Sequence, residues 1–351
     1  ISDEIAFKKA DELLAKMTLA EKIGQMTQID SSVVNFTDIT EYGIGSVLSG
    51  GDAMPSDIHA KGWAEYCDRV QSMALKTRLA IPIIYGIDSL HGSNKTMNAV
   101  IFPHHIGLGA SNNPVLVEKI ARITAFESRA SGFRWAFSPC VAVPLDERWG
   151  RTYEGFSEDG SITAALGAAE VRGLQDSFET NGIAACAKHF IGDGGTQHGI
   201  DQGDCLMSEK EIREKFLPAY EEAVKNGVLT VMASYSSIKG EKMHGNRYWL
   251  TDVLKKELKF KGFIISDFDA LKQLGGTSKQ TVEKGINAGI DMVMVPYDYK
   301  TFITNLTELV EEKKVSEERI NDAVRRILYV KYKAGLFDSP YSDKDAALKV
   351  G

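Results

Sequence analysis

The sequence predicts an α/β fold in the form of a single-domain (β/α)8 TIM-type barrel, and two patterns support this fold class. Short apolar runs alternate with longer amphipathic segments almost throughout the 351 residues. Most of the apolar runs are continuous, which is typical of parallel strands covered on both faces. Seven such strand-then-helix repeats, with room for an eighth strand before residue 44, favour a closed barrel.

The predicted strands are the apolar runs at 44–48, 81–87, 135–143, 183–190, 229–235, 261–266 and 290–295. The predicted helices are the amphipathic segments at 57–76, 115–131, 161–176, 208–226, 249–258, 279–288, 300–312 and 316–334. Ser208 and Glu211 have the spacing of a capping box at a helix start. An open, doubly wound sheet is the alternative fold, but the segment after Gly45 lacks the glycine-rich phosphate turn typical of that fold.

Charge and composition exclude several classes of function. The net charge is −7 and acidic and basic residues are interspersed, so no basic surface for nucleic acid is expected. The longest apolar runs are far shorter than the ~20 residues of a membrane span, so no membrane partner is expected either. The four cysteines form no metal or redox motif, and there is no phosphate loop. We therefore expect no metal and no organic cofactor.

Polar side chains collect where the predicted strands end. Because barrel enzymes build their active sites at the C-terminal ends of the strands, these side chains predict one shared site. They are Asp88, His91, Asp146, Arg148, Arg151, Lys188, His189, Ser234, Tyr235, Ser266, Asp267 and Asp269. Charged groups bind hydroxyls strongly, and the aromatic faces of Trp149, Tyr153 and Phe268 can cover a sugar ring. The predicted ligand is therefore a polyhydroxylated ring.

Two of these residues have other interpretations. Asp267 can be a strand-end aspartate that caps the following helix. Lys188 can be a Schiff-base lysine, since a lysine at a barrel strand end also serves that chemistry. Against these, a carboxylate fixed beside a sugar can attack the anomeric carbon and form a glycosyl ester. The clustering of polar strand ends favours this last interpretation.

Seven sequence blocks carry a resemblance to a known family. They are MTLAEKIGQMTQ (17–28), YGIDSLHG (85–92), IFPHHIGLGA (101–110), DERWGRTYEGFSED (146–159), AKHFIGDGG (187–195), TVMASYSS (230–237) and KGFIISDF (261–268). From about residue 12 to 345 the sequence resembles the N-terminal barrel domain of glycoside hydrolase family 3. It is most similar to the branch of β-glucan exohydrolases and β-glucosidases.

The resemblance implies roles for six residues. Asp267 matches the nucleophile of the family, and Asp88 matches the carboxylate that binds hydroxyls of the terminal glucose. The other matches are ring-binding residues of the same subsite, namely Arg151, Lys188, His189 and Tyr235. Phe268 stands where this branch usually has tryptophan, which leaves the preferred oligosaccharide open.

The implied activity is that of a retaining, exo-acting β-D-glucosidase that needs no cofactor. In this branch a second α/β sandwich domain follows the barrel and supplies the glutamate that acts as general acid/base. We expect a barrel over 1–336 and a linker or tail over 337–351, without that usual second domain. The chain can then be a fragment or processed form, can need a partner chain that carries the second domain, or can be a one-domain enzyme.

Two alternative functions stay open at the level of sequence. One is a β-N-acetylglucosaminidase that uses a loop histidine, for which His198 is the candidate. The other is a sugar-binding half that is inactive without its partner domain. Because polymeric glucans lie outside cells, we expect the protein to be secreted or periplasmic.

Overall fold

The computed structural model describes residues 1–351 and contains a closed barrel of eight parallel strands. Two sheets, ordered β11-β1-β2-β3-β4 and β10-β7-β5, are joined into a ring by the parallel bridges Trp135–Ala184 and Ile265–Met292. The strands are β1 Thr27–Asp30, β2 Ser46–Ser49, β3 Ile84–Ile87, β4 Trp135–Ala136, β5 Cys186–Phe190, β7 Thr230–Ala233, β10 Phe263–Ile265 and β11 Val293–Met294. The predicted fold class is confirmed, and β1 is the eighth strand.

One predicted strand is much shorter than expected. The apolar run 135–143 forms ladder pairs as β4 only over Trp135–Ala136. Pro139 lies in the middle of this run and has no N–H to donate, so a continuous ladder cannot pass through it. The chain beyond it stays close to the neighbouring strand, because the Val141 N–H donates to the Lys188 carbonyl at 2.8 Å.

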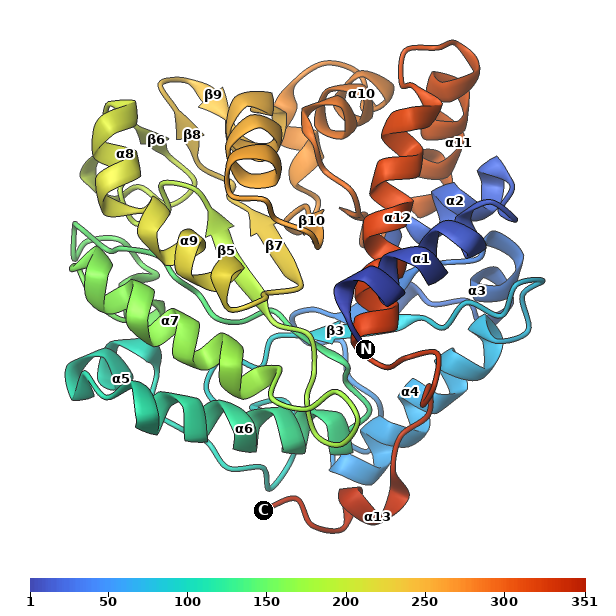
Figure 1. Ribbon diagram of the computed structural model, residues 1–351, viewed down its shortest axis with the longest axis horizontal. Helices are drawn as coiled ribbons and strands as arrows, with labels where there is room; N and C mark the ends of the chain where they lie inside the picture. Colours follow the sequence, from blue (N-terminus) through green and yellow to red (C-terminus); the bar gives the residue numbers. More distant parts are fainter.

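Helices surround the strands, as Figure 1 shows. Eight helical segments were predicted. Seven of them contain one helix that begins and ends within a few residues of the expected bounds, and the segment 208–226 contains two. The helices are α4 Ala60–Ala74, α6 Pro114–Ala130, α7 Gly160–Leu174, α8 Glu209–Lys215, α9 Leu217–Lys225, η5 Tyr248–Glu257, α10 Ser278–Ala288, α11 Tyr299–Glu311 and α12 Glu317–Lys333. None of the helices is both long enough and apolar enough to cross a membrane.

The segment 208–226 forms two helices rather than the one predicted. Ser208 and Glu211 make the predicted capping box at the start of α8. The first helix ends at Lys215, and Pro218 lies in the first turn of α9. A proline ring clashes with the preceding helical turn and offers no N–H, so it is tolerated at a helix start but not in the interior.

The remaining elements pack on the outer helices or connect the strands and helices of the barrel. The N-terminal helix α1 Asp3–Leu14 lies against α12, with the rings of Phe7 and Tyr329 stacked at 4.1 Å. After α12, the segment 337–351 runs to α13 Lys344–Ala347, which contacts α4 and α6. The other short elements are α2 Leu19–Gln25, α3 Phe36–Tyr42, α5 His105–Ser111, β6 Asp204–Cys205, β8 Ser237–Ile238 and β9 Glu241–Lys242.

Aromatic side chains fill the barrel next to β3 and β4. Trp135 is fully buried and packs edge-on against Phe137 and Phe263, with ring centroids 4.9 and 5.2 Å away. Gly86 on β3 leaves the space for this packing, because a Cβ at that position would lie 2.4 Å from the Phe137 ring. The interior is therefore a packed core, which confines ligand binding to the ends of the strands.

Candidate active site

Asp267 follows β10 at the C-terminal end of the barrel and is 9% exposed. Its two carboxylate oxygens differ in environment. Oδ1 accepts a hydrogen bond from the Phe268 N–H at 2.7 Å, whereas the buried Oδ2 has no hydrogen-bond partner. The imidazole of His189 faces Oδ2, with its Nε2 3.7 Å away. One oxygen is thus fixed by the backbone and the other is free to react.

The backbone of Asp267 is held by a buried histidine. The Asp267 N–H donates to His244 Nε2 at 3.0 Å. His244 comes from η4 Met243–Gly245, a short turn that follows β9. Burial lowers the pKa of His244 to about 3, so its ring is neutral and Nε2 is available as an acceptor. This contact orients the residue that carries the free carboxylate oxygen.

Lys188 and His189, at the end of β5, face the same site. Lys188 Nζ lies 3.1 Å from Asp88 Oδ1, and its side chain is 3% exposed, whereas Asp88 is 40% exposed. Burial opposes the charge of Lys188, but the charge of Asp88 outweighs it and raises the lysine pKa. A Schiff-base lysine must lose its proton to react, so this environment disfavours the aldolase interpretation.

His189 is oriented by a largely buried carboxylate. Its Nδ1 is 2.8 Å from Asp193 Oδ2, which leaves Nε2 directed at Asp267 and Arg151. Burial would raise the pKa of Asp193, but His189 and Arg151 hold it below its usual value. Asp193 therefore stays ionised and fixes the orientation of the His189 ring, because the hydrogen bond of one ring nitrogen determines where the other nitrogen points.

Arg151 reaches the cluster from the loop after β4. It makes a bidentate ion pair with Glu154, with Nε–Oε2 at 2.5 Å and Nη2–Oε1 at 3.0 Å. Its Nη2 also lies 3.5 Å from His189 Nε2. Burial opposes its charge, yet Glu154 raises the pKa of Arg151, so the guanidinium remains a fixed cation beside the free carboxylate oxygen.

Tyr235 and two further aromatic residues lie beside Asp267. The Tyr235 hydroxyl donates to the Phe268 carbonyl, one residue after Asp267. Burial raises the pKa of Tyr235, as does the charge of Asp267, so the phenol stays protonated. Phe268 packs edge-on against Tyr297 with ring centroids 5.7 Å apart, and Tyr297 is 55% exposed. These rings form an apolar border beside the polar cluster.

The six predicted site residues form one connected cluster. Pairwise contacts link Asp88 to Lys188, Arg151 to His189, and His189 to Asp267, and Tyr235 adjoins Asp267 through Phe268. Other polar strand-end residues lie outside it. Arg148 pairs with Asp146, and Asp269 pairs with Lys272 at 2.5 Å.

His198 also lies outside the cluster. It is exposed, with a φ of 59°, in the short turn Gln197–Gly199, and its side chain makes no hydrogen bond or ion pair with the site. No observation supports its use as a catalytic loop histidine.

Two residues of the site were not predicted. Glu154 follows Arg151 by three residues, a spacing that could have suggested the ion pair. His244 is separated from Asp267 by 23 positions and follows a small two-stranded hairpin, so no local sequence signal indicated it.

One group of side chains has the composition of a metal site. Ligand atoms of Cys140, His189 and Asp193 lie within 4.8 Å of one another. However, burial and the charge of Asp193 raise the pKa of the Cys140 thiol to about 12, and a thiol binds metal as the thiolate. The His189 Nδ1 and Asp193 are already bonded to each other. His189 and Asp193 therefore act as a hydrogen-bonded pair within the cluster.

Burial is the largest influence on the pKa of Asp267 and raises it. The charges of His189, Lys188 and Arg151 and the Phe268 N–H oppose this effect. The other nearby carboxylates are all engaged: Asp88 with Lys188, Asp193 with His189, Glu154 with Arg151, and Asp201 with the Trp149 indole N–H at 2.9 Å. Among these carboxylates, Asp267 is the one with a fully buried oxygen that has no hydrogen-bond partner.

Comparison with known proteins identifies the family. Residues 18–330 match the family described as "Glycosyl hydrolase family 3 N terminal domain". The chain is 36% identical to "Lysosomal beta glucosidase" of Dictyostelium discoideum, over 96% of this chain and 45% of that protein. It is 31% identical to "Periplasmic beta-glucosidase" of Salmonella typhimurium, over 94% of this chain and 42% of that protein.

Solved structures of glycosidases are also similar to this chain. An exo-1,3/1,4-β-glucanase from a Pseudoalteromonas species superposes with a TM-score of 0.94 at 37% identity, over 99% of this chain and 45% of that one. A β-glucosidase from Listeria innocua superposes with a TM-score of 0.85 at 30% identity, over 95% and 47%. The chain spans about half the length of these relatives. It therefore belongs to glycosyl hydrolase family 3 and forms the N-terminal barrel domain of that family.

Proposed function

We propose that this barrel is the nucleophile-bearing half of a retaining, exo-acting β-D-glucosidase. The observation that carries the proposal is the buried, unpartnered Oδ2 of Asp267, which lies beside His189, Lys188 and Arg151 at the end of the barrel. A buried carboxylate with one oxygen fixed and the other without a partner has the geometry of an attacking group.

Five residues around Asp267 are proposed to hold the terminal, non-reducing glucosyl ring. Asp88 is the half-exposed acceptor for hydroxyls, while Arg151, Lys188 and His189 are donors, and Tyr235 borders the ring. Hydrogen bonds from charged groups to hydroxyls are strong and directional. The Listeria innocua relative has been solved with glucose and, as a mutant, with laminaribiose, which supports a glucosyl ligand and short β-glucans as substrates.

The proposed reaction proceeds in two displacements. Asp267 Oδ2 forms a bond to C1 while the bond from C1 to the aglycone oxygen breaks, which gives a glycosyl ester. Water then attacks C1 from the opposite side and gives a proton to the conjugate base of the acid used in the first step. The ester bond breaks, Asp267 returns as a carboxylate, and the sugar leaves with its original configuration. The departing oxygen must receive a proton in the first step, and an acid is needed for this.

That acid is proposed to come from outside the barrel. All carboxylates of the cluster other than Asp267 are paired with a cation or an indole N–H, so none is placed to give a proton to the aglycone. We propose that a glutamate of a second domain or partner chain supplies it. The relatives named lysosomal and periplasmic support a site of action outside the cytosol.

Covalent trapping tests this proposal on the chain itself. With 2,4-dinitrophenyl 2-deoxy-2-fluoro-β-D-glucoside, the leaving group needs no acid, and the fluorine slows hydrolysis of the ester. We expect one 2-fluoroglucosyl group per chain, located by mass spectrometry in the peptide 261–272, with glucose protecting against labelling. A label on another residue would show that the nucleophile is wrongly assigned. Glucose binding by calorimetry without any label would favour a sugar-binding half.

The rate of this labelling should depend on pH. Only the ionised Asp267 can attack, and burial raises its pKa above the ordinary value of 3.8. The rate constant should therefore fall as the pH is lowered through the raised pKa, with a midpoint above that of an exposed aspartate. Labelling rates measured between about pH 3 and pH 8 give this midpoint. A midpoint at or below 3.8 would contradict the assignment of the titration to a buried carboxylate.

A further inference from the structure

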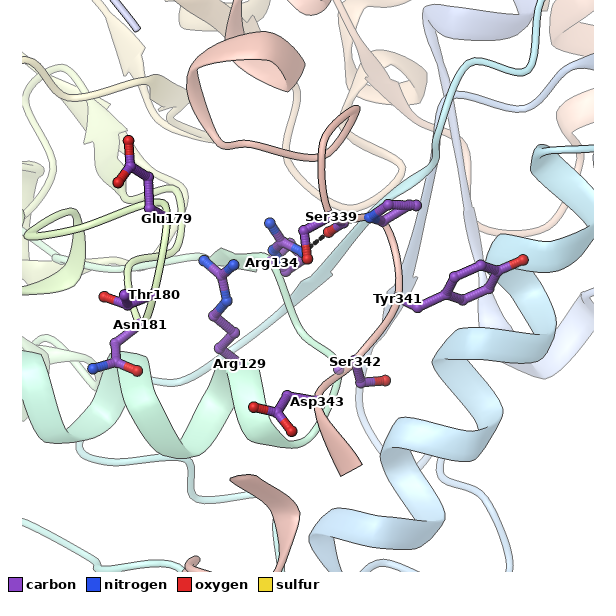
Figure 2. A pocket seen from close by; sticks show the side chains of 11 residues that line it. Arg129, Arg134, Glu179, Thr180, Asn181, Ser339, Tyr341, Ser342 and Asp343 are labelled. Atoms are coloured by element: carbon purple, nitrogen blue, oxygen red, sulfur yellow. Dashed lines mark hydrogen bonds between the residues drawn. The ribbon is translucent and has the colours of Figure 1, made fainter. Parts of the chain in front are cut away.

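A second cleft lies at the end of the barrel opposite Asp267. It has a volume of about 290 Å³ and lies between the end of α6, the loop after α7 and the segment 339–343. Arg134 lines the cleft and immediately precedes β4, so the cleft lies at the N-terminal ends of the strands. Asp267 follows β10 and so lies at their C-terminal ends. Figure 2 shows that the side chains of Arg129 and Arg134 extend toward the same space. The cleft is therefore separate from the sugar site.

The two arginines of the cleft have no carboxylate partner. Arg134 is 5% exposed; its Nη1 donates to the Ser339 carbonyl at 2.6 Å and its Nη2 to the Ala334 carbonyl at 3.0 Å. Its Nε is buried and makes no hydrogen bond. Arg129 Nη1 donates to two carbonyls, those of Phe178 and Gly182, at 2.8 Å each. No ion pair in the chain includes either residue, although 12 arginine–carboxylate pairs occur elsewhere.

Carbonyl groups satisfy hydrogen bonds but do not neutralise charge. Buried cations in proteins are normally paired with a carboxylate or another anion, because desolvation of an uncompensated charge is costly. Here burial lowers the pKa of Arg134 to about 9, and the charge of Arg129 adds to this effect. The cleft therefore contains two neighbouring guanidinium groups that form no ion pair, and Asp343 acts on Arg129 only from a distance.

The rest of the lining fits a small anion. The Thr180 hydroxyl and the Asn181 amide line the cleft, and neither side chain has a hydrogen-bond partner in the chain. The two carboxylates nearby do not reach the arginines. Glu179 is exposed and forms no ion pair, and Asp343 Oδ1 accepts from the N–H groups of Asp345 and Ala346 as the cap of α13. In Figure 2 both carboxylates lie apart from the guanidinium groups.

We propose that this cleft binds a small tetrahedral oxyanion, phosphate or sulfate, between Arg129 and Arg134. Guanidinium groups present planar pairs of N–H donors that match the oxygens of such anions, and free donors remain on Arg129. Metal cations are repelled by the two arginines. A bound anion bridges α6, the loop after α7 and the segment 339–343, and so ties the end of the chain to the barrel.

Thermal unfolding with inorganic phosphate tests the site. The midpoint of the 351-residue chain is compared in phosphate and in sodium chloride of equal ionic strength. At a phosphate concentration ten times the Kd, we expect the unfolding midpoint to lie about 2 °C above that in sodium chloride. Arg129→Gln should remove this rise. Arg247→Gln is the matched control, because Arg247 is exposed, makes no ion pair and lies outside the cleft, so the rise should remain.

A second variant should act in the opposite direction. Asp343→Asn removes a negative charge near Arg129 but keeps a residue that caps a helix equally well. Its apparent Kd for phosphate, from the saturable broadening of the phosphorus resonance, should fall at least about three-fold. An equal rise of the unfolding midpoint in the parent chain and in Arg129→Gln would mean that phosphate acts as a general stabilising salt, and this would overturn the proposal. The proposal would also be overturned if phosphate gave the parent chain no higher midpoint than sodium chloride.

Discussion

Replacing Asp267 with asparagine is expected to lower the rate constant of 2-fluoroglucosyl labelling by roughly 10⁴-fold or more. The side chain keeps its size and can still accept from the Phe268 N–H, so the cluster should stay folded. The amide oxygen, however, carries no charge and is a poor nucleophile at C1, so the glycosyl ester cannot form. The measurement is the pseudo-first-order labelling rate from intact-protein mass spectra.

Asp269→Asn is the matched control for this experiment. Asp269 lies two residues further on and pairs with the exposed Lys272, outside the cluster. Its φ of 54° is one that asparagine also adopts, so the backbone should be unaffected. We expect labelling within about three-fold of the parent rate. If both variants lost labelling equally, the effect would reflect the local backbone rather than the carboxylate of Asp267.

The strands could be predicted where the barrel interior is apolar, but not where it is polar. The seven predicted strands are nearly continuous apolar runs, and all of them were found. The strand that was not located, β1, has the sequence TQID, in which all four residues are buried. Gln28 donates to Ser46 on β2, and Asp30 accepts from the Gly50 N–H. These partners come from other strands, so burial of such polar residues has no apolar signature in the sequence.

The same limit applies to the site. Asp267, Lys188 and His189 could be assigned to the rim because each immediately follows or ends an apolar strand, and chain position alone brings such residues together. The hydrogen bond from Asp267 to His244 depends on how β8, β9 and the following turn fold at the rim. The hydrophobic periodicity of the sequence does not predict that fold. The place of Asp267 at the rim could therefore be predicted, whereas its contact with His244 required the structure.

The position of the nucleophile also depends on a buried charge network at the start of β10. Asp291 is fully buried and lies 2.7 Å from Lys255 Nζ; it also pairs with Arg319. Its Oδ2 accepts the N–H of Ile264, in the middle of β10, at 2.8 Å. Asp291 thus joins the helix before β10 and α12 to the strand that precedes Asp267.

Asp291→Asn is expected to lower the free energy of unfolding by about 3–5 kcal/mol, because it removes the only fully buried carboxylate of the network. The buried Lys255 and the largely buried Arg319 then keep only the partly exposed Asp322 as an acidic partner. Chemical denaturation followed by tryptophan fluorescence measures this loss. Asp322→Asn is the control, since Asp322 is 43% exposed at the edge of the same network. It should cost about 1 kcal/mol or less.

The loss caused by Asp291→Asn should itself depend on pH. Burial alone would raise the pKa of Asp291, but Lys255, Arg319 and Arg326 lower it to about 2, against 3.8 for an ordinary aspartate. A carboxyl group whose pKa is lowered by folding stabilises the folded chain above its unfolded pKa, and this contribution is lost as the pH falls toward its folded pKa. The difference between parent and variant should therefore be constant from about pH 5 to 7 and shrink below about pH 4. A difference that grew on acidification would mean that Asp291 is not ionised in the folded chain, and the barrel would then have to hold β10 in place by packing alone.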